Sequence, residues 1–368
     1  MQFCNKVSKA AVIGGGNIGT QFACICASKG YEVSMFSSKA DKFSKELEIV
    51  NEFDEVTHGN ISLVTDDLKE AISGCQIVLV TYPAFKLPEL AEDMLPFIEK
   101  GMCICVIPGT GGAEFAFRKC IQAGAILLGL QRVPSVARLE QYGKRVRCEG
   151  LRSELFLASI PADQAEKWSP FFEYVWDIPC IPLPNYLNVT LTPSNPILHT
   201  TRLKTLFEDY KEGVFYERNP LFYGDWSDRS SELLLACDQE LQEICHKLDK
   251  MDLSYVRSLK IHYESETVQA MTQKISTIKS LHNLTSPMIE TPNGWIPDLQ
   301  SRYFTADFPY GLAIIEEFAK IVGVDVPNVK DTMDWYRKVS GEMNSLKLAE
   351  FGITSVEDIY ALYHSETD

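Results

Sequence analysis

The sequence predicts an α/β protein in which a Rossmann-type dinucleotide-binding domain is followed by an all-helical domain. Three observations favour this fold. Short apolar runs alternate with amphipathic stretches through the first half of the chain, the pattern of a parallel sheet with helical crossovers. A glycine-rich loop directly follows the first apolar run. Beyond about residue 185 the strand pattern gives way to long helical periodicity.

The chain is long enough for two domains, because 368 residues exceed the size at which one hydrophobic core usually stops growing. A stiff connection that contains Pro182 and Pro184 separates the two patterns. We therefore expect a Rossmann NAD(P)-binding domain over residues 1–184. A helical catalytic and substrate domain is expected over residues 185–368.

The individual elements follow from the period of the apolar residues. Strands are expected at residues 10–13, 31–36, 77–81, 103–107, 125–130, 144–148 and 155–159. Amphipathic helical stretches are expected in the first domain at 18–29, 40–49 and 162–175, and helices in the second at 187–209, 231–250, 310–322, 329–339 and 356–363.

Composition and charge exclude several classes of partner. The formal net charge of -15 opposes binding to nucleic acid or to anionic lipid, and no apolar run is long enough to span a membrane. The eleven cysteines and six histidines show no metal-ligand spacing, so no metal site is expected. The start of the chain lacks the apolar core of a signal peptide. We expect a cytoplasmic protein, with a homodimer left open.

The glycine-rich loop has the context that a nucleotide-binding motif needs. Gly14, Gly16 and Gly19 follow an apolar strand and open a helix. In such a loop the glycines allow a tight turn, close approach of a diphosphate and packing of the helix on the strand. The amino terminus of the helix, with Asn17 and Ile18, offers free N–H groups to phosphate. A tight glycine turn without a ligand is the competing interpretation.

The end of the second expected strand favours NADP over NAD, although NAD stays possible. An NAD site usually has an acidic residue there to hold the ribose hydroxyl. This chain has Ser37, Ser38 and Lys39, which suit a 2′-phosphate. Asp41 lies close enough to keep NAD open, and these residues could instead cap the next helix.

Pro83 ends the segment that follows the strand at residues 77–81. The carboxyl ends of parallel strands form the ligand-binding edge of a Rossmann sheet. We therefore include Pro83 among the cofactor-binding candidates. An ordinary strand-to-helix turn with proline at the start of the helix explains the segment equally well.

Two segments of the second domain supply a catalytic constellation. Pro196 should break or kink the helix just before His199, and histidine readily exchanges protons near neutral pH. Asp307 and Arg302 could supply an orienting carboxylate and an anion clamp, and Asn195 is included with the catalytic candidates. Each also has an ordinary interpretation: a packed histidine, a helix cap at Asp307 and a surface arginine.

These segments resemble the opine dehydrogenases, the octopine and nopaline dehydrogenase family. The resemblance is carried by NPILH at residues 195–199 and SRYFTADFPYGL at 301–312, with the GGGNIG loop in register. It implies an NAD(P)H-dependent reductive condensation of an amino acid with a 2-oxo acid. His199 matches the family's catalytic histidine, Asp307 the aspartate that orients it, and Arg302 an arginine of the substrate region.

Two other functions stay open. A 2-oxo acid reductase of the ketopantoate reductase type shares the expected architecture, but that class is expected to use a lysine in the helical domain. No lysine of this chain has a setting as distinctive as that of His199. A protein that binds NADP as a sensor without turnover would not need the histidine, the aspartate and the arginine together.

Overall fold

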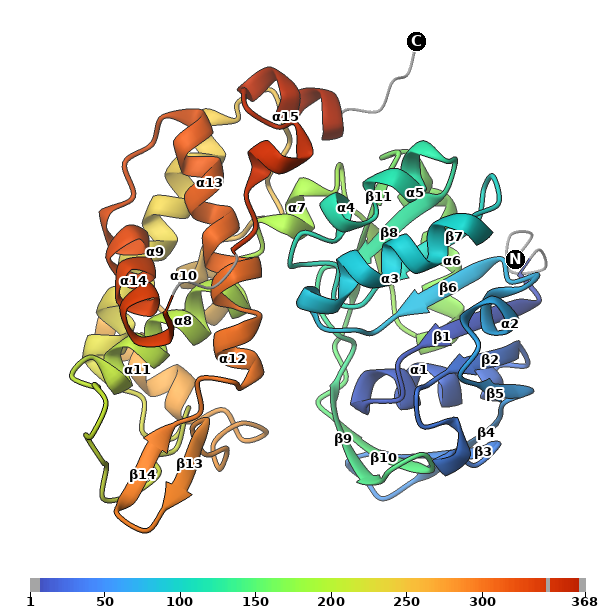
Figure 1. Cartoon of the computed structure of the whole chain (residues 1–368), viewed down its shortest axis with the longest axis horizontal. Helices are drawn as coiled ribbons and strands as arrows, with labels where there is room; N and C mark the ends of the chain where they lie inside the picture. Colours follow the sequence, from blue (N-terminus) through green and yellow to red (C-terminus); the bar gives the residue numbers. More distant parts are fainter. Residues whose placement is uncertain (1–6, 342–344, 364–368) are drawn as a thin grey trace. The chain divides into compact units, whose positions relative to one another are not determined.

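The structure is a computed structural model that describes residues 7–341 and 345–363. Its described residues divide into two compact units, the first comprising 7–190 with Tyr363 and the second the described part of 191–362. Figure 1 shows the helices and strands of both units. The domain boundary after residue 184 stays a prediction. The last residues of the predicted helical domain, 364–368, lie outside the described residues.

The first unit is built on an eight-stranded sheet with the order β12-β11-β8-β7-β6-β1-β2-β5. All of its strand pairs are parallel except β11 with β8. The strands are β1 (Lys9–Ile13), β2 (Glu32–Phe36), β5 (Leu63–Thr65), β6 (Ile77–Val80), β7 (Cys103–Val106), β8 (Ile126–Leu130), β11 (Leu155–Ile160) and β12 (Cys180–Pro182). The chain order reverses at β1, which lies between β2 and β6. In sheets of this kind ligands bind at the carboxyl ends of the strands beside such a reversal.

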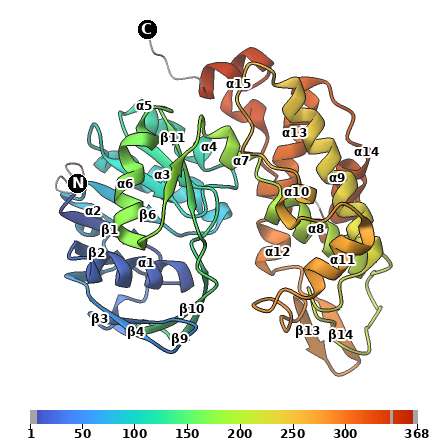
Figure 2. The ribbon, with the colours of Figure 1, turned by 180° about the vertical axis from the view of Figure 1, so that it is seen from behind.

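Helices cover both faces of this sheet. Figure 2 shows α1 and α6 on the near face, and Figure 1 shows α3 and α5 on the other. The helices are α1 (Asn17–Ser28), α2 (Leu68–Ile72), α3 (Leu87–Met94), α4 (Ala113–Ala116), α5 (Arg118–Gln122), α6 (Gln164–Trp176) and α7 (Leu187–Thr190), with the short turns η2 (Ala40–Lys42), η3 (Ala84–Lys86) and η4 (Leu95–Phe97). The predicted Rossmann-type domain is confirmed.

A second, four-stranded sheet was not predicted. It has the order β4-β3-β10-β9 and packs against α1. Its strands are β3 (Glu46–Val50), β4 (Val56–Asn60), β9 (Val136–Gln141) and β10 (Arg145–Glu149). The amphipathic helical stretch expected at residues 40–49 is therefore wrong, because most of it forms β3. Helix α1 is apolar on several sides and buries residues 19–24 and Cys26 between the two sheets.

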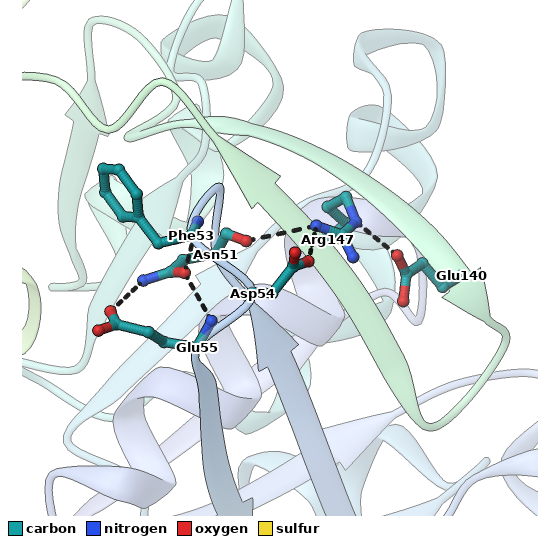
Figure 3. Close-up of polar contacts among 6 residues, drawn as sticks. All are labelled: Asn51, Phe53, Asp54, Glu55, Glu140 and Arg147. Carbon is teal, nitrogen blue, oxygen red and sulfur yellow. Dashed lines mark hydrogen bonds and ion pairs between the residues drawn. The ribbon is translucent and has the colours of Figure 1, made fainter.

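One end of this small sheet is fixed by polar contacts (Figure 3). Arg147 donates to Asp54 at 2.9 Å and to Glu140 at 2.5 Å, which joins β10 to β9 and to the turn between β3 and β4. Within that turn, Oδ1 of Asn51 accepts a hydrogen bond from the backbone N–H of Glu55 at 2.9 Å. These contacts hold the β3–β4 turn against β10.

The second unit is mainly helical. Helix α9 packs against α8, α11, α13 and α14. Its elements are α8 (Ser194–Phe207), α9 (Asp228–Lys247), α10 (Leu259–Tyr263), α11 (Val268–Ser276), α12 (Arg302–Thr305), the π-helical turn η5 (Phe308–Leu312), α13 (Ala313–Val322), α14 (Pro327–Ser340), η6 (Leu348–Phe351) and α15 (Val356–Tyr363). The predicted helical domain is confirmed. One exception is a two-stranded hairpin, β13 (Met288–Thr291) with β14 (Gly294–Pro297).

The helix break near His199 lies earlier than predicted. Helix α7 ends at Thr190 and α8 begins at Ser194, so the chain is interrupted before Pro196 rather than at it. Pro196 occupies the first turn of α8, where a missing N–H costs no helical hydrogen bond. Among the described residues, no helix is long and apolar enough to cross a membrane.

Candidate active site

The glycine loop between β1 and α1 has two glycines that the fold itself requires. Gly14 has a φ of +113°, in the region that favours glycine. A Cβ on Gly19 would lie 1.6 Å from the carbonyl oxygen of Gly14, so helix and loop could not approach as they do. A Cβ on Gly16, by contrast, would meet nothing within 4 Å. The space beside Gly16 is therefore open to a ligand.

The amino terminus of α1 fits the diphosphate of a dinucleotide. Gly16 stands at the N-cap without a capping side-chain hydrogen bond, so the first N–H groups of the helix are presented beside the open position. The side chain of Asn17 has a structural partner, since its Oδ1 accepts from the backbone N–H of Leu139 at 2.9 Å. Ile18 is half-buried in the same turn. For Asn17 and Ile18, backbone contact with the cofactor stays a prediction.

The end of β2 presents hydroxyl groups and an ammonium. Ser37 is buried, and its hydroxyl accepts a hydrogen bond from the backbone N–H of Lys39 at 3.2 Å. Ser38 and Lys39 are exposed. The Lys39 ammonium lies 5.6 Å from the ring centroid of Tyr142, a distance at which the ring attracts the cation. Tyr142, which the sequence analysis did not identify, holds this lysine at the strand end.

The segment after β6 joins the glycine loop. The backbone N–H and the hydroxyl of Thr81 both donate to the carbonyl of Ile13 at 3.0 Å. Pro83 stands at the N-cap of η3, in agreement with the ordinary helix-start interpretation. Its contact with a cofactor stays a prediction.

A cavity of about 500 Å³ opens at the same edge of the sheet, a size typical of small-molecule sites. Phe36 at the end of β2 and Tyr82 after β6 both line it. The remaining lining residues come from the segments that follow β5 and β6: Asp66, Asp67, Leu68, Lys69, Lys86, Glu89, Leu90, Asp93 and Phe97. The sequence analysis missed these residues, because they carry no motif and meet only through the fold.

In the second unit, His199 and Asp307 form a direct pair. Nδ1 of His199 lies 2.9 Å from Oδ2 of Asp307, although 108 residues separate them. An ionised carboxylate only accepts hydrogen bonds, so Nδ1 carries the proton of the neutral imidazole. Both side chains are largely buried, with 13% and 20% of their surfaces exposed. In this tautomer Nε2 is the ring nitrogen without a proton.

Close packing of α8 and η5 brings the pair together. The backbone of Gly311 in η5 lies so near Pro196 that an added Cβ would be 3.1 Å from the proline Cβ. Asp307 stands at the N-cap of η5, yet its side chain makes no capping hydrogen bond. Its carboxylate bonds to His199 instead. The helix-cap interpretation of Asp307 therefore does not describe its side chain.

Tyr223 is a third member of this cluster that the sequence analysis missed. Its hydroxyl oxygen lies 2.9 Å from Nε2 of His199. The rings of Tyr303 and Phe222 pack on the imidazole at centroid distances of 4.7 and 5.7 Å. No local pattern marks Tyr223, because an irregular loop carries it.

The two other catalytic candidates, one on α8 and one on α12, are exposed. Asn195 lies in the first turn of α8, four residues before His199, and Arg302 is the first residue of α12. A spacing of four places Asn195 and His199 on one side of the helix. Their contacts with a substrate stay predictions. Within 7–341 and 345–363, no three His, Cys, Asp or Glu side chains are grouped to hold a metal.

The comparisons with known proteins agree with both units. Residues 182–340 match the alpha-helical domain of the NAD/NADP octopine/nopaline dehydrogenases, and residues 9–114 match the amino terminus of the NAD-dependent glycerol-3-phosphate dehydrogenases. Octopine dehydrogenase of Mizuhopecten yessoensis is 26% identical over 91% of this chain and 90% of its own length. Residues 182–340 therefore match the opine dehydrogenase family, and the whole chain is similar to opine dehydrogenases over nine-tenths of its length. The predicted resemblance is thereby confirmed.

Further similarities support the family and the fold. Tauropine dehydrogenase of Arabella iricolor is 24% identical over 90% of this chain and 91% of its own length. The solved structure of octopine dehydrogenase with NADH and pyruvate superposes with a TM-score of 0.81 at 22% identity, covering 95% of this chain and 97% of that one. The chain is an NAD(P)-dependent oxidoreductase.

The surroundings of Gly16 and Gly19 predict different effects of the same substitution. Gly16→Ala adds a methyl group to open space where the diphosphate would approach, so we expect the Kd for NADPH to rise about tenfold or more with an unchanged melting temperature. Gly19→Ala places a methyl group against the carbonyl oxygen of Gly14. The loop and the helix must then move apart, which should lower the melting temperature. Fluorescence titration with NADPH and thermal unfolding measure both effects. Normal NADPH affinity in Gly16→Ala would contradict the assigned position of the diphosphate.

Proposed function

We propose that this enzyme condenses an amino acid with a 2-oxo acid and reduces the product, with His199 and Asp307 as its proton relay. The products are a secondary amine dicarboxylate, water and NAD(P)⁺. The observation that carries the proposal is the 2.9 Å contact between Nδ1 of His199 and Oδ2 of Asp307. It fixes the imidazole tautomer and leaves Nε2 for general acid–base chemistry.

The relay is needed where the oxo oxygen leaves. The amine adds to the oxo carbon, and the resulting carbinolamine must lose its hydroxyl group as water. A protonated His199 supplies that proton from its Nε2 side, while the Asp307 carboxylate stabilises the imidazolium. NAD(P)H supplies the hydride that reduces the resulting imine carbon. Without the Asp307 carboxylate, the imidazole ring of His199 would not be held in one orientation.

Arg302 and Asn195 are proposed to bind the substrate. A guanidinium can hold a carboxylate through two parallel hydrogen bonds, which makes Arg302 a suitable clamp for one substrate carboxylate. Exposure of its side chain in the first turn of α12 supports access to a ligand. Asn195 offers an amide on the side of α8 that carries His199.

The residues of the first unit support NADP as the preferred cofactor, with NAD as the alternative. Gly14, Gly16 and Gly19, with the amino terminus of α1, suit the diphosphate. Ser37, Ser38 and Lys39 are proposed to bind the 2′-phosphate. Asp41 lies beyond the strand end, in η2, and is exposed, which keeps NAD as the alternative. The 500 Å³ cavity between Phe36 and Tyr82 would take the adenine side of the cofactor.

We place the enzyme in the cytoplasm. The described cysteines are free thiols, and nine of the ten are buried. Such a set is typical of a reducing compartment. A homodimer stays a prediction.

A screen for NADPH oxidation tests the proposed function. The enzyme is mixed with NADPH and each 2-oxo acid, with and without each amino acid, and absorbance is followed. We expect oxidation only when both substrates are present. Oxidation by an oxo acid alone would support the 2-oxo acid reductase instead. NADPH binding without turnover under all conditions would support a sensor.

Ser38→Asp tests the cofactor preference. A carboxylate at the end of β2 repels the 2′-phosphate and accepts a hydrogen bond from a ribose hydroxyl. We expect the ratio of kcat/KM for NADPH to that for NADH to fall about tenfold or more. Ser38→Asn is the matched control and should change the ratio little. Equal use of both cofactors by the unchanged enzyme would contradict the charge argument.

Arg302→Lys tests the substrate clamp, because it keeps the charge and removes the planar fork. We expect KM for one substrate to rise about tenfold, with kcat and the melting temperature close to those of the unchanged enzyme. Steady-state kinetics with each substrate varied in turn identify which carboxylate is held. Unchanged KM values in Arg302→Ala would show that the arginine is a surface charge.

Substitutions in the relay should not be additive. His199→Ala should lower kcat by about 10²- to 10⁴-fold while NADPH binding stays near normal. Asp307→Asn should also be severe, and the double variant should be little worse than the worse single variant, because the two groups act as one unit. Full kinetics of the three variants measure this coupling. Losses that multiply would mean that Asp307 has a separate role.

A further inference from the structure

In the proposed relay the proton comes from the Nε2 side of His199, and the contacts at Nε2 indicate the group through which it reaches the substrate. Nδ1 of His199 is engaged with Asp307, and at Nε2 the structure has the hydroxyl group of Tyr223, 2.9 Å away. We propose that Tyr223 is a catalytic residue that exchanges the proton directly with the oxygen of the 2-oxo acid, with His199 behind it. This inference rests on the proposed function and extends it by one residue.

The tyrosine hydroxyl is placed by a rigid loop. Arg202, one turn after His199 on α8, donates to the backbone carbonyls of Phe222 at 2.8 Å and Asp225 at 2.7 Å. Its guanidinium also lies 5.4 Å from the ring centroid of Trp226. Helix α8 thus carries both the imidazole and the cation that fixes the loop around Tyr223.

Arg202 is a buried cation that donates hydrogen bonds to the backbone of the loop around Tyr223. Its side chain is buried, with 2% of the residue exposed, and burial lowers the pKa of Arg202 to about 10. Its hydrogen bonds to Leu221, Phe222 and Asp225 all go to backbone carbonyls. A buried cation so used holds the local backbone in one conformation.

The tyrosine ring is fixed as well. It stacks on Trp226 with an interplanar angle of 14° and a centroid distance of 6.5 Å, and it contacts Phe222 edge to face at 5.0 Å. Only 6% of Tyr223 is exposed. Ring and loop together direct the hydroxyl toward Nε2, as a proton relay requires.

The proton can pass in either direction along this line. With a neutral imidazole, the Tyr223 hydroxyl donates to Nε2. With an imidazolium, Nε2–H donates to the phenol oxygen, whose own proton is then directed to another acceptor. The charge of His199 therefore decides whether the phenol proton is directed to Nε2 or away from it.

The step balances without an added reagent. As the C–O bond of the carbinolamine breaks, the leaving oxygen takes the phenol proton and departs as water. The phenol oxygen takes the proton from Nε2, so the imidazolium becomes neutral. The nitrogen lone pair of the substrate forms the C=N bond, and the positive charge moves from His199 to the iminium group. Nδ1 keeps its own proton and its hydrogen bond to the Asp307 carboxylate throughout.

Tyr223→Phe tests the role, because it removes the hydroxyl and keeps the ring. We expect kcat to fall about 10- to 100-fold. KM for both substrates and the Kd for NADPH should change by less than about twofold, and the melting temperature should be unchanged. Tyr216→Phe is the matched control: this tyrosine is in the same unit and packs on Phe207 and Tyr210. It should keep the kinetics of the unchanged enzyme.

A second measurement does not depend on turnover. Nitrogen-15 NMR of histidine-labelled protein reports the hydrogen bonding of each imidazole nitrogen, and His199→Ala identifies the His199 signals. Tyr223→Phe should shift the Nε2 signal of His199, and Tyr216→Phe should leave it unchanged. An unshifted signal in Tyr223→Phe would overturn the proposal, because the phenol would not be bonded to Nε2.

The kinetic outcomes separate this inference from the proposed function. Equal or faster turnover in Tyr223→Phe, with an active unchanged enzyme, overturns the role of the tyrosine alone. It would mean that the hydroxyl only occupies the position of the substrate oxygen. A similar loss in Tyr216→Phe also overturns it. An unchanged enzyme that is inactive with every substrate pair overturns the proposed function and this role with it.

Discussion

The chemistry of the second unit depends on how closely α8 approaches η5. Gly311 has no side chain where Pro196 lies against it, and this lets the turn that carries Asp307 reach the helix that carries His199. The π-helical turn closes with a hydrogen bond from the Leu312 N–H to the Asp307 carbonyl at 2.8 Å. Such turns are rare and are often found at functional sites. Here the turn places the Asp307 carboxylate beside Nδ1 of His199. The proton of the neutral imidazole is therefore on Nδ1, and Nε2 is able to accept one.

The first unit is governed by a similar close approach. Helix α1 lies between two sheets, and Gly59 of β4 sits so near it that an added Cβ would come 2.2 Å from the Cys24 carbonyl oxygen. At the amino terminus of α1, Oδ1 of Asn17 accepts a hydrogen bond from the backbone N–H of Leu139. The glycine loop therefore has a fixed backbone rather than an adaptable one. A preformed cradle of this kind lowers the entropic cost of holding the diphosphate.

The sequence predicted those features that depend on neighbouring residues. The parallel strands, the glycine loop and the helices of the second unit follow from local periodicity. The strand β3 was missed because its partners include β10, about a hundred residues away, and its apolar residues also fit a helix. The hairpin could have been found from Pro292, Asn293 and Gly294, a turn signal. Pro196 was misjudged because a proline in the first helical turn does not break a helix.

The candidate site divides in the same way. His199 and Asp307 were selected from their residue chemistry and paired through the family resemblance, and the structure adds the contact that joins them. Tyr223 could not be found, since its position depends on a loop held by Arg202 and on ring packing. The cavity beside Phe36 and Tyr82 likewise assembles from segments with no shared motif. Side chains that meet only in the folded protein leave no spacing in the sequence to recognise.

The most direct test of the proposed chemistry is the identity of the product. An amino acid labelled with nitrogen-15 is incubated with a 2-oxo acid, NADPH and the enzyme, and the products are analysed by mass spectrometry. The account predicts one product that holds the labelled nitrogen bonded to both carbon skeletons, with a mass equal to the two substrates minus water plus two hydrogens. A 2-hydroxy acid formed beside unchanged labelled amino acid would contradict it.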